Sequence, residues 1–207
     1  MRFKAIVIAA TALAAALTLN SAGTAQPSAT AASYDGEGRL LFPADYREWV
    51  YVTSGHGMSY AAVAANRPEP PFDNVFADRA AYRHFLATGT WPEGTVLVLE
   101  IRDGTSHGSI LRGGAFQTGN LLGIEVHVKD TARFGDDGWA FFSFDGEQPA
   151  TMIGREASCY SCHEANTATD RTFVQFYPTL LPVARAKGTL TPAYLAQEAA
   201  EREAAAQ

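Results

Sequence analysis

The most constraining feature of this chain is the sequence Cys-Tyr-Ser-Cys-His at residues 159–163. Two thiols three positions apart lie on one helical turn, and each can add to one vinyl group of a haem. The histidine directly after the second thiol is placed to give a nitrogen to the iron. The motif therefore predicts one covalent haem c, with Cys159 and Cys162 as thioether anchors and His163 as the proximal iron ligand.

Three other roles for a cysteine pair fit less well. Zinc usually takes four ligands, and the chain has two cysteines, so a zinc site would need two of the scattered histidines. A thioredoxin-like redox pair follows a strand in a βαβ pattern, which the sequence lacks. A short-loop disulfide needs no histidine after it. The haem interpretation is favoured because it uses all three side chains.

The N-terminus has the pattern of a secretory signal. Arg2 and Lys4 precede an apolar, alanine-rich run over residues 5–19. Small residues follow, which predicts cleavage after Ala25 or, as a second candidate, after Ala31. A retained membrane anchor is the alternative, but the run falls short of the about 20 apolar residues that span a bilayer. Covalent haem attachment also takes place outside the cytoplasm, so two features predict a bacterial periplasmic protein with no membrane span after cleavage.

Charge and length limit the partners and the number of domains. The chain has 16 basic and 22 acidic residues, and loss of the signal would leave a net charge of about −8. An acidic surface disfavours nucleic acid and anionic membranes and suits a basic redox partner protein. Roughly 180 mature residues suffice for one core. We expect a signal peptide at 1–25, a disordered leader at 26–38, one haem-binding domain at 39–190 and a helical tail at 191–207.

Periodicity predicts strands in the middle of the chain and helices at both ends. Asp78 and Gly89 should begin and end a helix over 79–87, and Asp45 can cap a shorter one. Apolar residues alternate with polar ones at 122–129, as in an antiparallel strand with one solvated face. The other strands are expected at 50–53, 95–101 and 139–144. The fold class is therefore α+β, a mainly antiparallel β-sheet with flanking helices around one c-type haem.

The sequence leaves the sixth iron position open. Met58, in a loop with two glycines, is a candidate ligand that would favour electron transfer. The alternative is a methionine that packs in the core or against the haem face. The remaining histidines are expected to be structural or solvated rather than ligands, and they are His56, His84, His107 and His127.

Several other side chains are candidates to surround the haem. Glu100 and Glu125 are candidate proton acceptors, although Glu100 points away from the face of its neighbour Leu99 if the strand is regular. Both are alternatively solvent-facing strand residues. Candidates to pair with the haem propionates are Arg102, Arg112 and Arg155. Candidate haem-wall aromatics, each of which fits ordinary core as well, are Phe116, Phe141, Phe173, Phe176 and Tyr177.

Several stretches of the sequence resemble the cytochrome P-460 family. They are Tyr-Arg-Glu-Trp-Val at 46–50, Gly-Thr-Val at 94–96, Trp-Ala-Phe-Phe at 139–142, and the haem motif with the aromatic run at 173–180. The resemblance covers residues 46–186 in the same order. It implies a mainly antiparallel sheet with helices, a homodimer, and a c-type haem with one proximal histidine and an open distal side.

In the name-giving members of this family a lysine bonds to the porphyrin edge, and the enzyme oxidises hydroxylamine. The resemblance places Leu99 at the position of that lysine, and a hydrocarbon side chain cannot form the nitrogen–carbon bond. The mature chain has two lysines, Lys129 and Lys187, and only Lys129 is a conceivable substitute. The resemblance therefore implies the branch without the cross-link, the cytochromes c-prime-beta, which bind small neutral gases in an apolar pocket.

These observations predict an exported mono-haem c-type cytochrome with an open or weakly ligated distal site. It would bind a small gaseous or nitrogenous ligand such as nitric oxide, transfer electrons, or both. The alternative is an enzyme, a haem oxidoreductase that acts on hydroxylamine or uses peroxide. A non-catalytic role is preferred because of Leu99. A pure electron carrier with a Met58 ligand is the third hypothesis.

Overall fold

The computed structural model describes residues 32–60 and 69–206. The predicted signal at 1–25 and both candidate cleavage sites lie outside the described residues. Among the described helices, none has the length and apolar character needed to cross a bilayer.

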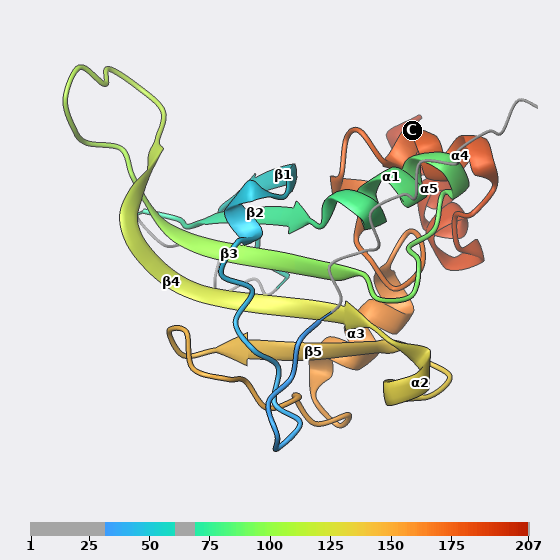
Figure 1. Ribbon diagram of the computed structural model, residues 1–207. Helices are drawn as coiled ribbons and strands as arrows, with labels where there is room; N and C mark the ends of the chain where they lie inside the picture. The colour runs from blue at the N-terminus through green and yellow to red at the C-terminus, as the bar shows by residue number, and fades with distance from the viewer. Residues whose placement is uncertain (1–31, 61–68, 207) are drawn as a thin grey trace, which may run out of the picture.

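Five antiparallel strands form one sheet, and strands that follow one another in sequence also lie side by side (Figure 1). Their bounds are β1 (Val50–His56), β2 (Phe72–Ala77), β3 (Val96–Thr105), β4 (Phe116–Lys129) and β5 (Trp139–Phe144). The predicted strands are present, but β2 was not predicted. It begins directly after prolines at positions 68, 70 and 71, and such a proline-rich sequence predicts an irregular segment instead of a strand. Both β3 and β4 run further than expected because they pair with each other into the glycine-rich connection.

Helices flank this sheet, which confirms the predicted α+β class. They are the 3-10 turns η1 (Tyr46–Glu48) and η3 (Val174–Phe176), and the helices α1 (Arg79–Thr88), α2 (Thr131–Phe134), α3 (Ser158–Asn166), α4 (Leu181–Lys187) and α5 (Pro192–Ala205). The carboxylate of Asp78 accepts hydrogen bonds from the first backbone N–H groups of α1, and Gly89 ends it in the left-handed conformation, as predicted. The helix expected after Asp45 is only the single turn η1, because β1 begins at Val50.

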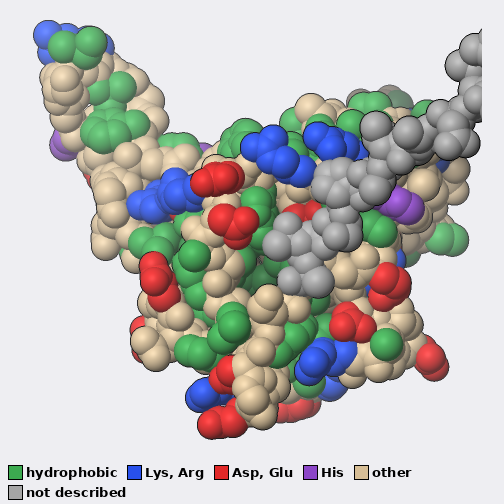
Figure 2. Space-filling model, viewed as in Figure 1, with side chains coloured by type: hydrophobic (Ala, Val, Ile, Leu, Met, Phe, Trp, Pro, Cys, Tyr) green, Lys and Arg blue, Asp and Glu red, His purple; other side chains and the backbone are tan. Residues whose placement is uncertain are grey.

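The long connection between β3 and β4 stands out from the sheet as an arm, defined here as residues 104–118 (Figure 1). Figure 2 shows that hydrophobic and basic side chains gather at its tip. Ile110 on this arm is 88% exposed. The arm therefore buries little of its own apolar surface within the monomer.

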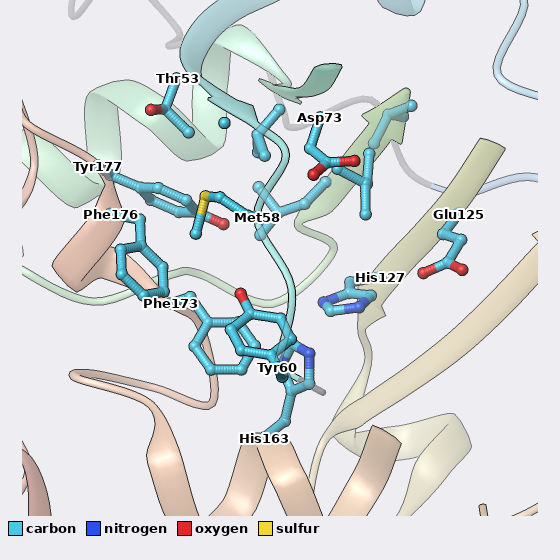
Figure 3. A pocket seen from close by; sticks show the side chains of 15 residues that line it. Thr53, Met58, Tyr60, Asp73, Glu125, His127, His163, Phe173, Phe176 and Tyr177 are labelled. Atoms are coloured by element: carbon cyan, nitrogen blue, oxygen red, sulfur yellow. The ribbon is translucent and has the colours of Figure 1, made fainter. Parts of the chain in front are cut away.

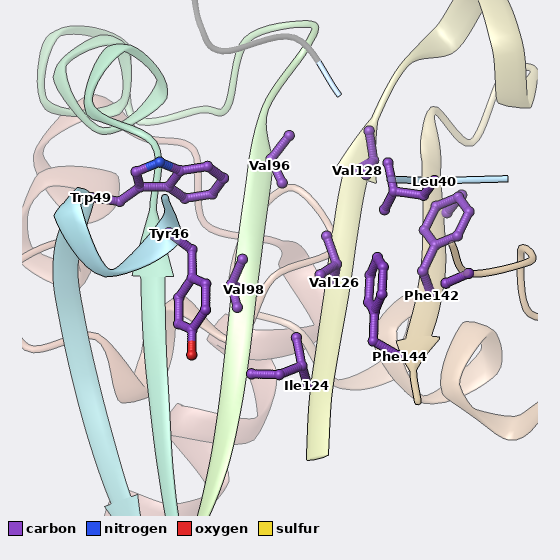
Figure 4. Packing of buried hydrophobic residues seen from close by; sticks show 12 residues of the cluster. Leu40, Tyr46, Trp49, Val96, Val98, Ile124, Val126, Val128, Phe142 and Phe144 are labelled. Atoms are coloured by element: carbon purple, nitrogen blue, oxygen red, sulfur yellow. The ribbon is translucent and has the colours of Figure 1, made fainter. Parts of the chain in front are cut away.

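One face of the sheet is covered by the N-terminal segment (Figure 4). Leu40, Tyr46 and Trp49 pack onto alternating apolar side chains of β3, β4 and β5, which include Val96, Val98, Ile124, Val126, Val128, Phe142 and Phe144. Contacts begin earlier in the chain than the expected leader boundary, because Tyr34 pairs with Leu40 and lies under the guanidinium of Arg133 at 3.8 Å.

The other face of the sheet is covered only in part. Leu97 and Trp139 pack there against Phe85 of α1 and Leu180 at the start of α4. Beyond this cluster the same face borders a cavity instead of solvent. The polar side of β4, which the sequence predicted to be solvated, borders this cavity at Glu125, which is exposed as predicted, and at His127, which is half-buried.

Candidate functional site

A cavity of about 300 Å³ lies on the incompletely covered face of the sheet (Figure 3). Volumes of this order are typical of small-molecule and cofactor sites. Strands β1 to β4 form one wall, and His163 together with the aromatic segment after α3 contributes to the other. Its side chains are Thr53, Met58, Tyr60, Asp73, Val75, Leu97, Val98, Leu99, Glu125, His127, His163, Phe173, Phe176 and Tyr177.

The cysteine motif forms helix α3 beside this cavity. Tyr160 anchors the helix, because its hydroxyl donates to the carbonyl of Ile153 at 3.0 Å and its ring packs edge-on against Phe141 of β5. Cys159 and Cys162 are partly exposed free thiols, three positions apart on the helix. Within the described residues, no group of three or more His, Cys, Asp or Glu side chains is arranged to hold a metal ion.

His163 is held in the neutral form and the tautomer that an iron ligand requires. Its Nδ1 lies 2.8 Å from the carbonyl oxygen of Arg171. A carbonyl only accepts, so Nδ1 carries the proton and Nε2 keeps its lone pair. Burial lowers the pKa of His163, although the bond to Arg171 opposes that shift. The ring nitrogen that would not bind iron thus meets a backbone carbonyl.

His127 was expected to be structural or solvated, but its ring lies in the cavity against His163, with centroids 4.6 Å apart. It also packs edge-on against Phe141 at 4.1 Å. Burial holds the pKa of His127 well below its usual range, so the imidazole is neutral at pH 7. Alternation along β4 places His127 on the same side of the strand as Glu125. It does not show that this side borders a cavity.

Two carboxylates line the cavity. Glu125 was predicted and lies opposite Leu99 in the β3–β4 ladder. Asp73 was missed because β2 was not predicted. Burial raises the pKa of both side chains, and the charge of Glu125 raises that of Asp73 further. The cavity therefore has an apolar wall with two carboxyl groups of raised pKa.

Glu100 is not part of this cavity. It points to the opposite face, as its position beside Leu99 predicted, but it is buried there instead of facing solvent. It accepts hydrogen bonds from Tyr46, Arg47 and Arg102. Burial alone would raise the pKa of Glu100, but the bonds from Arg102 and Tyr46 outweigh it and lower the pKa.

The candidate propionate partners also lie elsewhere. Arg102 pairs with Glu100, Arg155 pairs with Asp137, and Arg112 is exposed on the arm. In the described part of the chain, none of these three arginines lines the cavity. The interpretation of these arginines as propionate partners is therefore not supported by their positions.

The expected aromatic wall is mostly present. Phe173, Phe176 and Tyr177 line the cavity, and Phe141 packs against His163 at 4.8 Å. The prediction for Phe116 is wrong, because this residue lies on the arm and is 43% exposed. The sequence interpretation missed Tyr60, which stacks on Phe173 with ring centroids 5.6 Å apart.

Leu99 and Met58 both line the cavity, as their proposed roles require. Figure 3 shows Met58 near Tyr177 and His163 further down, below the rings of Phe173 and Tyr60. The three histidines His56, His84 and His107 are not among the lining residues in the described chain.

Within the described residues, neither Lys129 nor Lys187 lines the cavity. Lys129 forms an ion pair with Asp170 at 2.8 Å, and Lys187 is exposed on α4. Lys129 is therefore engaged in another contact and does not take the role of the lysine whose position Leu99 is expected to occupy.

The donor set fits a c-type haem. Two free thiols lie on one turn of α3, the next residue is a neutral histidine with an unprotonated Nε2, and an apolar and aromatic cavity adjoins it. Cys159 and Cys162 would attach the macrocycle, His163 would bind its iron, and Leu99 would face it.

The comparison with protein families agrees with this site. The family model described as Cytochrome P460 matches residues 43–174, more than half of the chain. A search of curated proteins finds no match. The matched region contains the whole sheet and the Cys-Tyr-Ser-Cys-His helix. The chain therefore belongs to the cytochrome P460 family and is a haem-binding cytochrome.

Proposed function

We propose that this protein is a mono-haem c-type cytochrome whose open or weakly ligated distal site binds a small gas such as nitric oxide, transfers electrons, or does both. One cavity carries the proposal, because both His163 and Leu99 line it, and the family resemblance implies that Leu99 takes the position of the cross-linking lysine. Haem c would supply an iron that changes between ferric and ferrous states and binds one small ligand.

The cavity wall supports a small neutral ligand. Val75, Leu97 and Leu99 offer no hydrogen bond, so water and anions lose solvation when they enter. When ionised, Asp73 and Glu125 would also repel an anion. A diatomic gas loses few hydrogen bonds and carries no charge, so this wall excludes it least.

Hydroxylamine oxidation or peroxide use is the second candidate, and the two carboxylates favour it. The raised pKa of Asp73 and of Glu125 brings each group closer to the range of a general base at neutral pH. Either side chain lines the cavity and could take a proton from a nitrogenous or peroxidic ligand. Leu99 opposes only the cross-linked form of such an enzyme.

Electron transfer with a Met58 ligand is the third candidate. Met58 lines the same cavity as His163, and a thioether ligand would raise the reduction potential. The acidic chain suits a basic redox partner.

The proposal also covers the localisation and the oligomeric state of the protein. The signal pattern and the haem motif support export to the periplasm. A homodimer is proposed from the family resemblance, and the exposed Ile110 on the arm is a candidate contact. Light scattering of the purified protein measures the dimer, and sequencing of its mature N-terminus finds the cleavage site.

The haem proposal is tested on protein purified from the periplasm. We expect pigment that acidified acetone does not extract, an ordinary c-type Soret band, and a spectral change when nitric oxide is added. A colourless protein would refute the proposal. A strongly red-shifted Soret band would indicate a ring cross-link, and turnover of hydroxylamine above that of free haem would favour the enzyme.

Matched methionine variants test the sixth ligand. Met58 and Met152 are each 38% exposed, but only Met58 lines the cavity among the described residues. If Met58 is a ligand, Met58→Ala changes the spin state and lowers the reduction potential, whereas Met152→Ala leaves both unchanged. Identical spectra for the two variants would exclude the methionine ligand.

A further inference from the structure

The carbonyl group that binds His163 belongs to a turn with an unfavourable backbone. The N–H of Thr172 donates to the carbonyl of Thr169 at 2.8 Å, and the residues between them have φ of 45° (Asp170) and 53° (Arg171). Positive φ at both central positions is the geometry of a type I′ turn, which favours Gly, Asn and Asp. The Cβ of Arg171 disfavours this conformation. Contacts outside the turn must therefore help to hold it.

The Asp170 carboxylate supplies those contacts. It accepts hydrogen bonds from the backbone N–H of Trp91 at 2.9 Å and from Trp139 Nε1 at 3.3 Å. Lys129 Nζ donates to its two oxygens at 2.8 and 3.0 Å, and also to the carbonyl of Trp91 at 2.8 Å. One carboxylate thus ties the turn to β4, to β5 and to the segment after α1.

This ion pair is largely shielded from solvent. The side chains of Lys129 and Asp170 are each 17% exposed. A partly buried pair with additional hydrogen bonds holds its geometry better than an exposed pair, which water and salt screen. Loss of the cation would leave the carboxylate poorly compensated, so the turn would move toward solvent.

We propose that the Lys129–Asp170 ion pair positions the proximal ligand, because it holds the Arg171 carbonyl against Nδ1 of His163. The inference rests on the proposed role of His163 as iron ligand. The hydrogen bond at Nδ1 fixes the proton there and makes Nε2 a stronger electron donor. Lys129 acts through Asp170 and Arg171, so it is a positioning residue and does not touch the iron site.

The test compares two lysine variants of the holoprotein. Lys129→Met removes the cation and keeps most of the side chain, and Lys187→Met is the matched control on the exposed surface of α4. The readouts are the iron–histidine stretching frequency of the ferrous protein and the reduction potential, which is measurable whatever occupies the sixth position. A purely structural anchor would change stability and leave both readouts unchanged.

We expect Lys129→Met to lower the stretching frequency and to raise the potential, because a less electron-rich imidazole stabilises the ferric state less. Lys129→Arg should restore both values, and Lys187→Met should match the wild type. Should Lys129→Met fail to fold, Asp170→Asn serves instead, because Asn tolerates positive φ and keeps an acceptor oxygen but lacks the charge.

Two negative results have different meanings. In the first, the Lys129→Met protein, or Asp170→Asn in its place, is coloured but has the same stretching frequency and potential as the Lys187→Met control. This result overturns the positioning role and leaves the proposed function intact. A colourless wild-type protein refutes the proposed function itself.

Discussion

Replacing Glu100 with Ala tests the buried polar network on the sheet face opposite the cavity. The Glu100 side chain is 1% exposed and forms ion pairs with Arg47 and Arg102. It also accepts from the Tyr46 hydroxyl and, at 3.2 Å, from Asn74 Nδ2. Glu100→Ala would leave these four donors without their common acceptor.

The cost follows from the surroundings of each donor. Arg47 is 52% exposed and can turn to water, whereas Arg102 is 18% exposed and is left as a poorly compensated charge. Asn74 keeps the Gln117 side chain as a partner at 2.7 Å. Breaking a buried ion pair costs about 3–5 kcal/mol. For a chain of this length, that corresponds to a fall in Tm of roughly 6–20 °C.

Urea unfolding of the holoprotein at pH 7, followed by circular dichroism, measures this loss. Glu147→Ala is the matched control, because Glu147 is exposed after β5 and should change the free energy of unfolding by at most about 0.5 kcal/mol. A loss below about 1 kcal/mol for Glu100→Ala would refute the assignment of the network as a stabilising element.

The stability difference between wild type and Glu100→Ala should also depend on pH. Hydrogen bonds lower the folded-state pKa of Glu100, so its ionisation stabilises the fold above the unfolded pKa of about 4.3. That contribution is lost as the pH falls through the folded pKa. The stability gap between wild type and Glu100→Ala should therefore be largest at neutral pH and narrow below about pH 4. A gap that widens on acidification would contradict the sign.

Three further predictions use the same unfolding assay. Asp78→Ala removes the cap of α1 and should cost about 1–2 kcal/mol, with Asp78→Asn restoring most of it; equal losses in the two variants would contradict the cap. Gly89→Ala should lower the free energy of unfolding by at least about 1 kcal/mol, since φ of Gly89 is +81° and the new Cβ would lie 2.8 Å from Lys187. The control Gly36→Ala places its Cβ in open space and should cost less. Burial raises the pKa of Glu125, so its ionisation destabilises the fold as the pH rises through that pKa. Glu125→Gln should therefore stabilise the protein at pH 7 and lose this gain near pH 4, and a larger gain at pH 4 would contradict the argument.

Several parts of this protein depend only on local spacing and could be predicted from its sequence. The Cys-Tyr-Ser-Cys-His motif indicated the haem chemistry, and the cap at Asp78 and the stop at Gly89 predicted α1. Alternation along β3 placed Leu99 and Glu100 on opposite faces. These features need only near neighbours in the chain, because a helical turn and a pleated strand each fix where the next side chains point.

Packing between distant segments selects the sheet face that borders the site, and this could not be predicted from the sequence. Alternation shows that two faces differ, but it cannot show which one the helices leave open. Asp73 lines the cavity from β2, a strand that was not predicted. His127 lines it from the side of β4 that was expected to be solvated. The turn at Asp170 and Arg171 contacts His163 directly through the Arg171 carbonyl, and the ion-pair partner of Asp170, Lys129, lies 41 positions away in the sequence. Such contacts are set by packing between distant segments, which local patterns do not encode.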